Sequence, residues 1–126
     1  MITAASEGPN FRTRITNGTQ VVLADAEVGS GGGAAGFLPH ELLEASLASC
    51  MNVTLRMYAG THGIPLEGVQ TTVTLNRDDP DEAAFEYTLR LDGPLTDDQR
   101  TRLARAAAAC PVKRTLSRRI SFSQQS

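Results

Sequence analysis

The stretch "PHELLEASLASCMNVTLRMYAG", residues 39–60, decides the fold of this chain. Pro39 suits the first turn of a helix, where a missing N–H costs nothing, and no helix breaker follows before Gly60. Apolar residues cover most of the circumference of this predicted helix, so nearly all of its sides must be covered by other groups. One small sheet covers only one side. Either the chain wraps tightly around the helix or a second copy of the chain covers the remainder, and we expect a homodimer.

Strands are predicted on both sides of this helix. "FRTRI" (11–15) and "TQVVLAD" (19–25) flank Asn17-Gly18, a dipeptide typical of type I′ hairpin turns, in which both central residues need positive φ. The glycine-rich segment 26–39 is predicted to be a loop near a site, and it lacks the G-x-G-x-x-G spacing of a nucleotide site. Residues 69–79 and 83–93 alternate in polarity, which predicts two antiparallel strands.

The C-terminal third predicts two further helices. "TDDQ" (96–99) matches a capping box, and the helix that it begins runs to about Ala109. Pro111 must end or kink that helix and can begin a new one. "ISFSQ" (120–124) predicts a short closing strand. The expected protein is therefore an α+β chain with a single domain spanning residues 1–126.

Composition limits the partners and the compartment. The chain has 126 residues, a net charge of −2 and 21% charged residues, which describes an ordinary globular protein and not a nucleic-acid binder. The N-terminus lacks a secretory pattern and no stretch has the length of a membrane span, so we expect a cytoplasmic protein with no membrane partner. In a reducing compartment its two cysteines are core thiols, metal ligands or redox groups.

The two cysteines have different predicted settings. Cys110 would be the N-cap of a helix that begins at Pro111, where free N–H groups and the helix dipole favour a thiolate, and Lys113 adds positive charge. The alternative is a small residue tolerated at a helix junction. Cys50 has apolar neighbours on its helix face. Apolar surroundings alone do not activate a thiol, so reactivity at Cys50 requires a charge or a partner subunit.

Other titratable residues near Cys50 in sequence are less well placed. Glu41 is the candidate acid, but nine residues of one helix place it about 13 Å along the axis and roughly opposite Cys50. A bend near Pro39 or contact across a dimer interface would bring the two together. His40 and His62 lie at opposite ends of the helix, about 30 Å apart, so one metal site cannot contain both. We expect no metal.

Two spaced segments carry a family resemblance. "LADAEVGSGGGAAGFLPHELLEASLASCMNVTLRMYA" (23–59) and "ACPVKRTLS" (109–117) resemble the OsmC/Ohr family, and more narrowly its OsmC-like branch. The resemblance spans nearly the whole chain, and each segment contains one cysteine. It implies an α+β OsmC-like fold in an intertwined homodimer, in which two long central helices are wrapped by antiparallel sheets of both chains.

The resemblance also implies a chemistry. The family reduces organic hydroperoxides with cysteine and without a metal or a bound cofactor. Cys50 matches the peroxidatic cysteine, which becomes a sulfenic acid, and Cys110 matches the resolving cysteine, which condenses with it to a disulfide. An external dithiol or a lipoylated protein then reopens that disulfide. An apolar pocket around Cys50 would favour an alkyl or lipid peroxide over hydrogen peroxide.

The chain departs from the family pattern around the activating groups. The family's acid position corresponds to His40, with Glu41 one residue later, and Arg12 and Arg14 lie in the general region of the essential arginine. The residue that activates Cys50 stays open among these four. Two other functions also stay open. One is a dimer that binds an apolar ligand without catalysis, and the other is a redox sensor that forms the disulfide without turning over.

Overall fold

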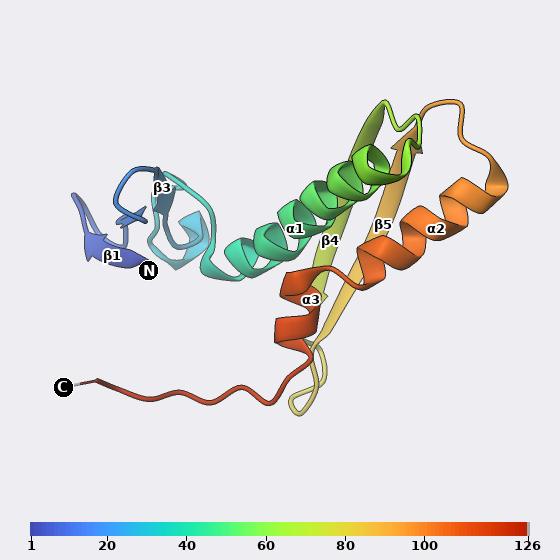
Figure 1. The fold of residues 1–126 in the computed structure, drawn as a ribbon. Helices are drawn as coiled ribbons and strands as arrows, with labels where there is room; N and C mark the ends of the chain where they lie inside the picture. Colours follow the sequence, from blue (N-terminus) through green and yellow to red (C-terminus); the bar gives the residue numbers. More distant parts are fainter. Residues whose placement is uncertain (126) are drawn as a thin grey trace. The chain divides into compact units, whose positions relative to one another are not determined.

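The computed structural model describes residues 1–125 and divides the chain into two compact units, residues 1–43 and 44–126 (Figure 1). The helix α1 begins in the first unit and continues into the second. None of the helices within residues 1–125 is both long and apolar enough to cross a membrane. In chain order the elements are β1 (Thr3–Ser6), β2 (Thr13–Thr16), β3 (Val21–Ala24), the 3₁₀ helix η1 (Val28–Ser30), α1 (Pro39–His62), β4 (Gly68–Asn76), β5 (Ala84–Asp92), α2 (Asp97–Ala108) and α3 (Pro111–Leu116).

The core of the second unit forms around one stripe of α1. Every fourth residue of this stripe is buried, as helical periodicity requires for a single covered face. The stripe packs against Leu103 and Ala107 of α2 and against the inward side chains of the β4–β5 hairpin. α1 therefore supplies the central wall of this core, through Leu47, Met51, Leu55 and Ala59.

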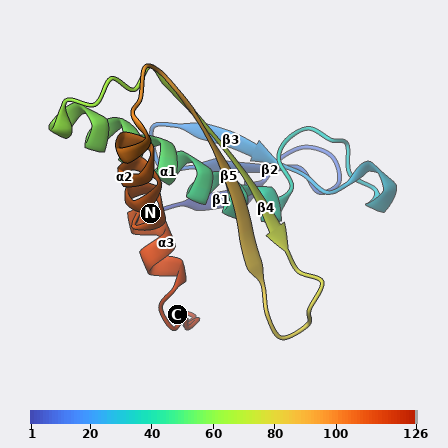
Figure 2. The same cartoon turned by 90° about the vertical axis from the view of Figure 1, so that its right-hand side faces the viewer.

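β4 and β5 form the two-stranded antiparallel sheet predicted from the alternating pattern (Figure 2). Their register runs from Gly68 opposite Asp92 to Asn76 opposite Ala84. In the described sheet β4 pairs only with β5, so N–H groups on its other edge need another acceptor. Oε2 of Glu44 on α1 accepts one of them, from Leu75 N at 2.7 Å. This bond gives Glu44 a structural role between α1 and the edge of the sheet.

The break between α2 and α3 lies where it was predicted. Thr96 and Gln99 form the capping box that begins α2, with side-chain-to-backbone bonds of 3.0 and 3.1 Å. The helix ends at Ala108, and Cys110 is the N-cap of α3 with Pro111 in its first turn. Because proline has no N–H, it takes a position where a helix leaves that group without a partner.

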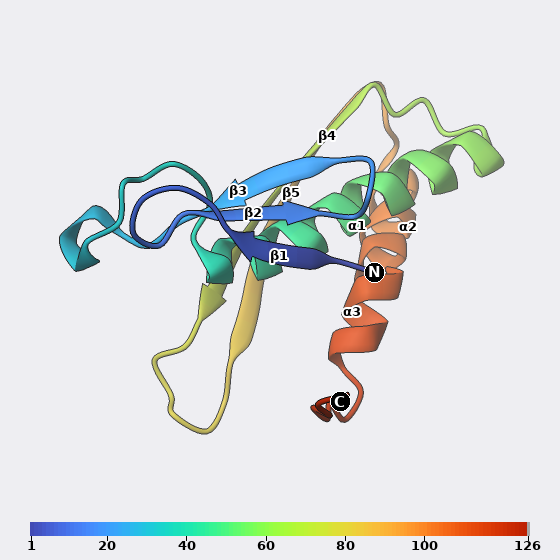
Figure 3. The same cartoon turned by 90° about the vertical axis from the view of Figure 1, so that its left-hand side faces the viewer.

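The first unit contains a three-stranded antiparallel sheet in the order β1-β2-β3 (Figure 3). The hairpin between β2 and β3 confirms the prediction, but its turn is not type I′. The loop has four residues, 17–20, and only Gly18 of the Asn-Gly pair has a positive φ. Asn17 instead accepts backbone N–H bonds from Thr19 and Gln20 with its side-chain oxygen, which makes a local Asx-type turn.

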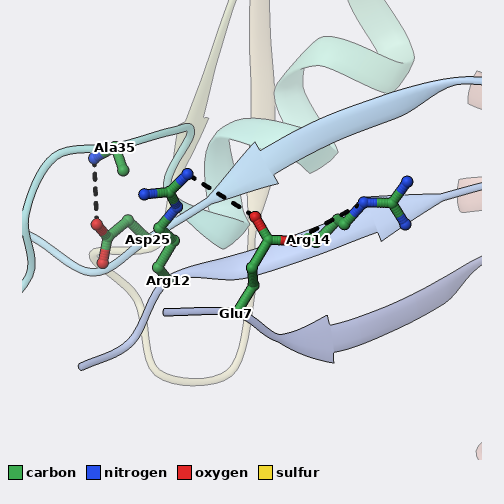
Figure 4. A network of polar contacts seen from close by, with 5 residues as sticks. All are labelled: Glu7, Arg12, Arg14, Asp25 and Ala35. Atoms are coloured by element: carbon green, nitrogen blue, oxygen red, sulfur yellow. Dashed lines mark hydrogen bonds and ion pairs between the residues drawn. The ribbon is translucent and has the colours of Figure 1, made fainter. Parts of the chain in front are cut away.

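The glycine-rich loop is built around a buried carboxylate. Asp25 is 5% exposed, and its oxygens accept N–H bonds from Ala26 and Gly33 at 2.7 and 3.0 Å. They also accept the N–H of Ala35 at 3.1 Å (Figure 4). These N–H groups, Ala35 first, lower the pKa of Asp25 below its ordinary value of 3.8. At Gly36 a Cβ would overlap the Leu23 carbonyl oxygen, so the loop returns to β3 at a distance that only glycine permits.

The predicted closing strand at 120–124 is not formed. After α3 the described residues contain no strand, and Ile120 and Phe122 are 52% and 95% exposed. A strand exists only when its backbone pairs with a neighbour, and residues 1–125 offer this segment no such neighbour. β1 is the converse case. It forms by pairing with β2, although its four exposed residues show no polarity pattern.

Asp25→Asn should destabilise the fold at pH 7, because an amide can accept only some of the N–H bonds that the carboxylate accepts. Since the folded pKa of Asp25 is depressed, its contribution is present above about pH 4 and is lost as the pH falls through the folded pKa. Urea midpoints of wild type and variant should therefore differ at pH 7 and converge towards pH 3. Asp81→Asn, in the exposed turn between β4 and β5, is the control. A constant difference at both pH values would contradict the interpretation.

Candidate active site

The structure brings the two cysteines together within the second unit. Cys50 lies in the middle of α1 and Cys110 at the start of α3, and both are free thiols. The backbone N–H of Val112 donates to Sγ of Cys50 at 3.4 Å. Cys110 lies close enough to Cys50 for the Cys50 thiol to raise the pKa of Cys110. Two positions sixty residues apart in the sequence thus form one sulfur pair beside the α2–α3 break.

Burial determines the direction of the pKa shift of Cys110. This direction corrects the prediction that the start of α3 favours a thiolate there. Cys110 is 0% exposed, and burial raises the pKa of its thiol above the ordinary value of 9.0. The hydrogen bond to Cys50 and the charge of a Cys50 thiolate raise this pKa further. The backbone N–H and the ammonium of Lys113 oppose the rise without cancelling it. The α3 N-terminus was expected to favour a thiolate at Cys110, but desolvation outweighs it.

Cys50 is the more accessible of the two sulfurs. It is half-buried and packs against the core, whereas the neighbouring residues Val53 and Met57 of α1 are 58% and 69% exposed. At about 100° per residue, Met57 and Cys50 lie on nearly the same side of the helix. The sulfur of Cys50 therefore sits at the margin between the buried stripe of α1 and an exposed apolar face.

Glu41 has a structural role at the start of α1. Its Oε1 accepts the backbone N–H of Leu38 at 2.7 Å, which satisfies a donor at the helix N-terminus. α1 is continuous from Pro39 to His62, so helical rise separates Glu41 from Cys50 by about 13 Å along the axis. His40 lies in the same first turn and is exposed.

The two candidate arginines belong to an ion-pair cluster of the first unit. Nitrogens of Arg12 and Arg14 lie 3.8 and 3.7 Å from the carboxylate of Glu7 (Figure 4). The charge of Arg12 also helps to lower the pKa of Asp25. Arg14 is exposed, as its alternating strand predicts, and Arg12 is half-buried. Both guanidinium groups are therefore engaged by carboxylates of their own unit.

A hollow of about 280 Å³ is lined mainly by residues of α1, β5 and α3. Leu47 in its wall lies three residues before Cys50 on α1, and Lys113 follows the residue that donates to Cys50. Phe85 and Tyr87 of β5 form its aromatic side. Sequence reasoning missed these two aromatic residues as part of a site, although their alternation on β5 predicted that they face inward. Among residues 1–125, no three His, Cys, Asp or Glu side chains are grouped to hold a metal ion.

The sequence profile of the OsmC-like protein family matches residues 30–124, which contain both cysteines and the whole of α3. This chain belongs to the OsmC-like family. None of the curated proteins compared with the chain is similar to it in sequence. The match crosses the boundary between the two units, so the family region includes the glycine-rich loop from Ser30 onward as well as the thiol pair.

Solved structures of OsmC-like proteins have the same fold. The OsmC-like protein of Mycoplasma pneumoniae aligns with a TM-score of 0.78 at 20% identity, over 92% of this chain and 85% of that one. An organic hydroperoxide resistance protein of Legionella pneumophila aligns at 0.65 and 22%, over 93% and 88%. The organic hydroperoxide resistance protein OhrB of Bacillus subtilis aligns at 0.64 and 22%, over 93% and 89%. The predicted α+β OsmC-like fold is confirmed.

The difference in burial predicts the order in which the thiols react. N-Ethylmaleimide should modify Cys50 at least tenfold faster than Cys110 in the native protein at pH 7, because Cys110 is fully buried and holds its proton. Peptide mass spectrometry after timed quenching measures both rates. In urea the two rates should become similar. Faster labelling of Cys110 in the native protein would contradict this assignment.

Proposed function

We propose that this OsmC-like protein is a cysteine-based peroxidase that reduces organic hydroperoxides to alcohols. The observation that carries the proposal is the sulfur pair, in which a half-buried Cys50 accepts the Val112 N–H and lies against Cys110. Two structural neighbours named organic hydroperoxide resistance proteins support a role of this kind in oxidative stress. The proposal places the protein in the cytoplasm, where thiols are kept reduced.

In the first step, a thiolate at Cys50 attacks one oxygen of the hydroperoxide. A sulfur–oxygen bond forms, the oxygen–oxygen bond breaks, and the leaving alkoxide takes a proton to become the alcohol. Cys50 is oxidised to a sulfenic acid while the peroxide is reduced. The Val112 N–H, 3.4 Å from Sγ, is placed to stabilise negative charge on the sulfur before the attack.

In the second step, the thiol of Cys110 condenses with the sulfenic acid. A disulfide forms, and the hydroxyl of the sulfenic acid leaves as water with the thiol proton. Cys110 supports this role because it is buried against Cys50 and its raised pKa keeps it protonated until the oxidised sulfur appears. An external dithiol, small or lipoylated, then reduces the disulfide by thiol exchange and is itself oxidised.

The surroundings of the sulfurs favour an organic substrate. Cys50 packs against an apolar core that includes Leu47 and Met51. Apolar surroundings bind an alkyl or aryl group and offer little to hydrogen peroxide. Activation of Cys50 by Glu41 stays a prediction. The carboxylate of Glu41 accepts the backbone N–H of Leu38. Within this proposal, Glu41 therefore reaches Cys50 only by contact across the dimer interface.

A homodimer is part of the proposal. Val53 and Met57 are exposed on α1, beside a hollow of about 480 Å³ between α1 and the start of β4. Neighbouring exposed apolar side chains on a long helix mark an interaction surface. The segment 120–124 has a strand pattern without a partner in the described chain, which also supports pairing with a second copy. The dimer would cover the side of α1 that one chain leaves open.

Reduced protein mixed with cumene hydroperoxide should lose two thiols per chain at least a hundredfold faster than free cysteine does. Cys50→Ser should abolish turnover with dithiothreitol, whereas Cys110→Ser should still form the sulfenic acid, which a dimedone adduct reveals by mass spectrometry. Oxidation without turnover would favour the redox sensor. Thiols that react no faster than free cysteine, together with a co-purified apolar molecule in native mass spectrometry, would favour the non-catalytic binding protein.

The dimer should be visible by size-exclusion chromatography with light scattering, at twice the mass of 13.4 kDa. Val53→Asp with Met57→Asp should raise the dissociation constant at least tenfold, about 1.4 kcal/mol, because two carboxylates would be buried at the interface. Ala104→Asp, at an exposed position of α2, is the matched control and should leave the mass unchanged. A monomeric wild type at micromolar concentration would remove the dimer from the proposal.

A further inference from the structure

The C-terminal part of the chain has a charge opposite in sign to the rest. Residues 99–126 contain seven Arg and Lys and no Asp or Glu, whereas residues 1–98 contain five Arg and fourteen Asp and Glu. A chain with a net charge of only −2 therefore has a strongly positive end. Charge segregated in this way produces a local field that attracts anionic groups of other molecules.

Four of these cations lie on and directly after α3. Lys113 and Arg114 belong to the helix, and Arg118 and Arg119 follow its C-cap. The three arginines are exposed and Lys113 is half-buried. From residue 117 to residue 125 the chain continues without a helix or strand, and all of these residues are exposed (Figure 1). We call Lys113, Arg114, Arg118 and Arg119 the α3 basic surface.

The α3 basic surface has no carboxylate partner within the described chain. The ion pairs among residues 1–125 involve other cations, namely Arg12, Arg14 and Arg90. Like charges held close together repel one another, and anionic groups of a second molecule relieve that repulsion when they approach. The surface is therefore suited to an anionic partner that arrives from outside the chain.

The dipole of α3 accounts for only part of this charge. Cations are favourable in the last turn of a helix, and Lys113 and Arg114 have that position. The effect is confined to the terminal turn, so it gives no reason for Arg119, which lies beyond the helix end at Leu116. It also gives no reason for the absence of acidic residues across the whole of 99–126.

The basic surface is continuous with the thiol pair along α3. Cys110 is the N-cap of this helix, and its carbonyl accepts the N–H of Arg114 at 3.1 Å. The N–H of Val112 in the same turn contacts Cys50 Sγ at 3.4 Å. A helix of six residues is about 9 Å long. A molecule seated on the surface therefore lies about one short helix away from the sulfurs, within reach of a flexible arm.

We propose that the α3 basic surface docks the acidic face of a protein that carries the reducing dithiol on a flexible arm. The inference rests on the proposed peroxidase function, which leaves open whether the external dithiol is small or protein-bound. A positive surface gives a small neutral dithiol no advantage, whereas it increases the rate of encounter with an acidic protein. Nucleic acid fits less well, because the fourteen acidic residues of 1–98 repel a phosphate backbone.

The docked arm would reduce the disulfide by two thiol exchanges. One thiolate of the arm attacks the Cys50 sulfur, which is the more accessible of the pair. The bond between Cys50 and Cys110 breaks, and Cys110 leaves and takes a proton. The second thiol of the arm then attacks the arm's sulfur in the mixed disulfide, which releases Cys50 and leaves the arm as a cyclic disulfide. Two electrons and two protons pass from the arm to the protein.

The test compares two synthetic peptides that each carry one dihydrolipoyl-lysine, flanked on both sides by glutamates or by glutamines. With cumene hydroperoxide as the oxidant, wild type should have a kcat/KM about tenfold higher for the glutamate peptide, and added salt should reduce this ratio. Arg118→Gln with Arg119→Gln should lower the ratio at least threefold, and Arg118→Glu with Arg119→Glu should bring it below one. Neutral dihydrolipoamide should serve wild type and both variants equally, because neither arginine takes part in the thiol chemistry.

Arg77→Gln with Arg105→Gln is the matched control. It removes the same two charges from exposed positions outside the basic surface, one after β4 and one on α2. The control should leave the peptide ratio as in wild type. If it lowers the ratio as much as Arg118→Gln with Arg119→Gln does, general attraction to the positive end of the chain replaces the docking surface. A wild-type ratio near one would also overturn the proposal.

A binding measurement separates this inference from the proposed function. By fluorescence anisotropy, a labelled glutamate peptide should bind wild type at least fivefold more tightly than it binds Arg118→Gln with Arg119→Gln. The same difference in a protein whose thiols react no faster than free cysteine would overturn the peroxidase and leave a surface for acidic proteins. Equal use of both dithiol peptides, in a protein that does turn over, would overturn the surface and leave the peroxidase. Displacement of the glutamate peptide by phosphatidylglycerol vesicles at a lower anion concentration would identify a lipid surface and overturn the protein partner.

Discussion

The hydrogen bond from Val112 to the sulfur of Cys50 exists because α2 and α3 are separate helices. In one continuous helix the Val112 N–H would bond to the carbonyl of Ala108, four residues earlier. Pro111 prevents that continuation, and the first turn of α3 keeps N–H groups without helical partners. One of these groups reaches Cys50 at 3.4 Å. The sulfur pair and its chemistry depend on this interruption of the backbone.

The core of the second unit holds the two thiols in unequal environments. Met51, the residue after Cys50, belongs to the buried stripe of α1 and is 0% exposed. Its packing fixes the position of the helix next to the Cys50 sulfur. Cys110 lies inside the same core, where desolvation opposes ionisation. The proposed two-step thiol reaction would use this inequality. In that proposal the accessible Cys50 meets the oxidant, and the buried Cys110 keeps its proton until it attacks the Cys50 sulfenic acid.

In the first unit, the carboxylate of Asp25 orders a loop with many glycines. It accepts hydrogen bonds from three backbone N–H groups, and these bonds offset the conformational entropy that the loop loses when it is ordered. Glycine at position 36 permits the close return to β3. The charged cluster of Glu7, Arg12 and Arg14 lies in the same unit, so both candidate arginines are held by carboxylates.

The sequence by itself determined the elements whose signals are local. Pro39, the Thr96 capping box and Pro111 act within a turn of their own positions, so α1, α2 and α3 begin where these residues predict. The tertiary structure alone decided which groups meet. It raised the pKa of Cys110 by burial, left residues 120–124 without a strand partner and placed Lys113 beside an aromatic hollow. Desolvation, strand pairing and cavity shape arise between segments distant in sequence, and no local pattern encodes them.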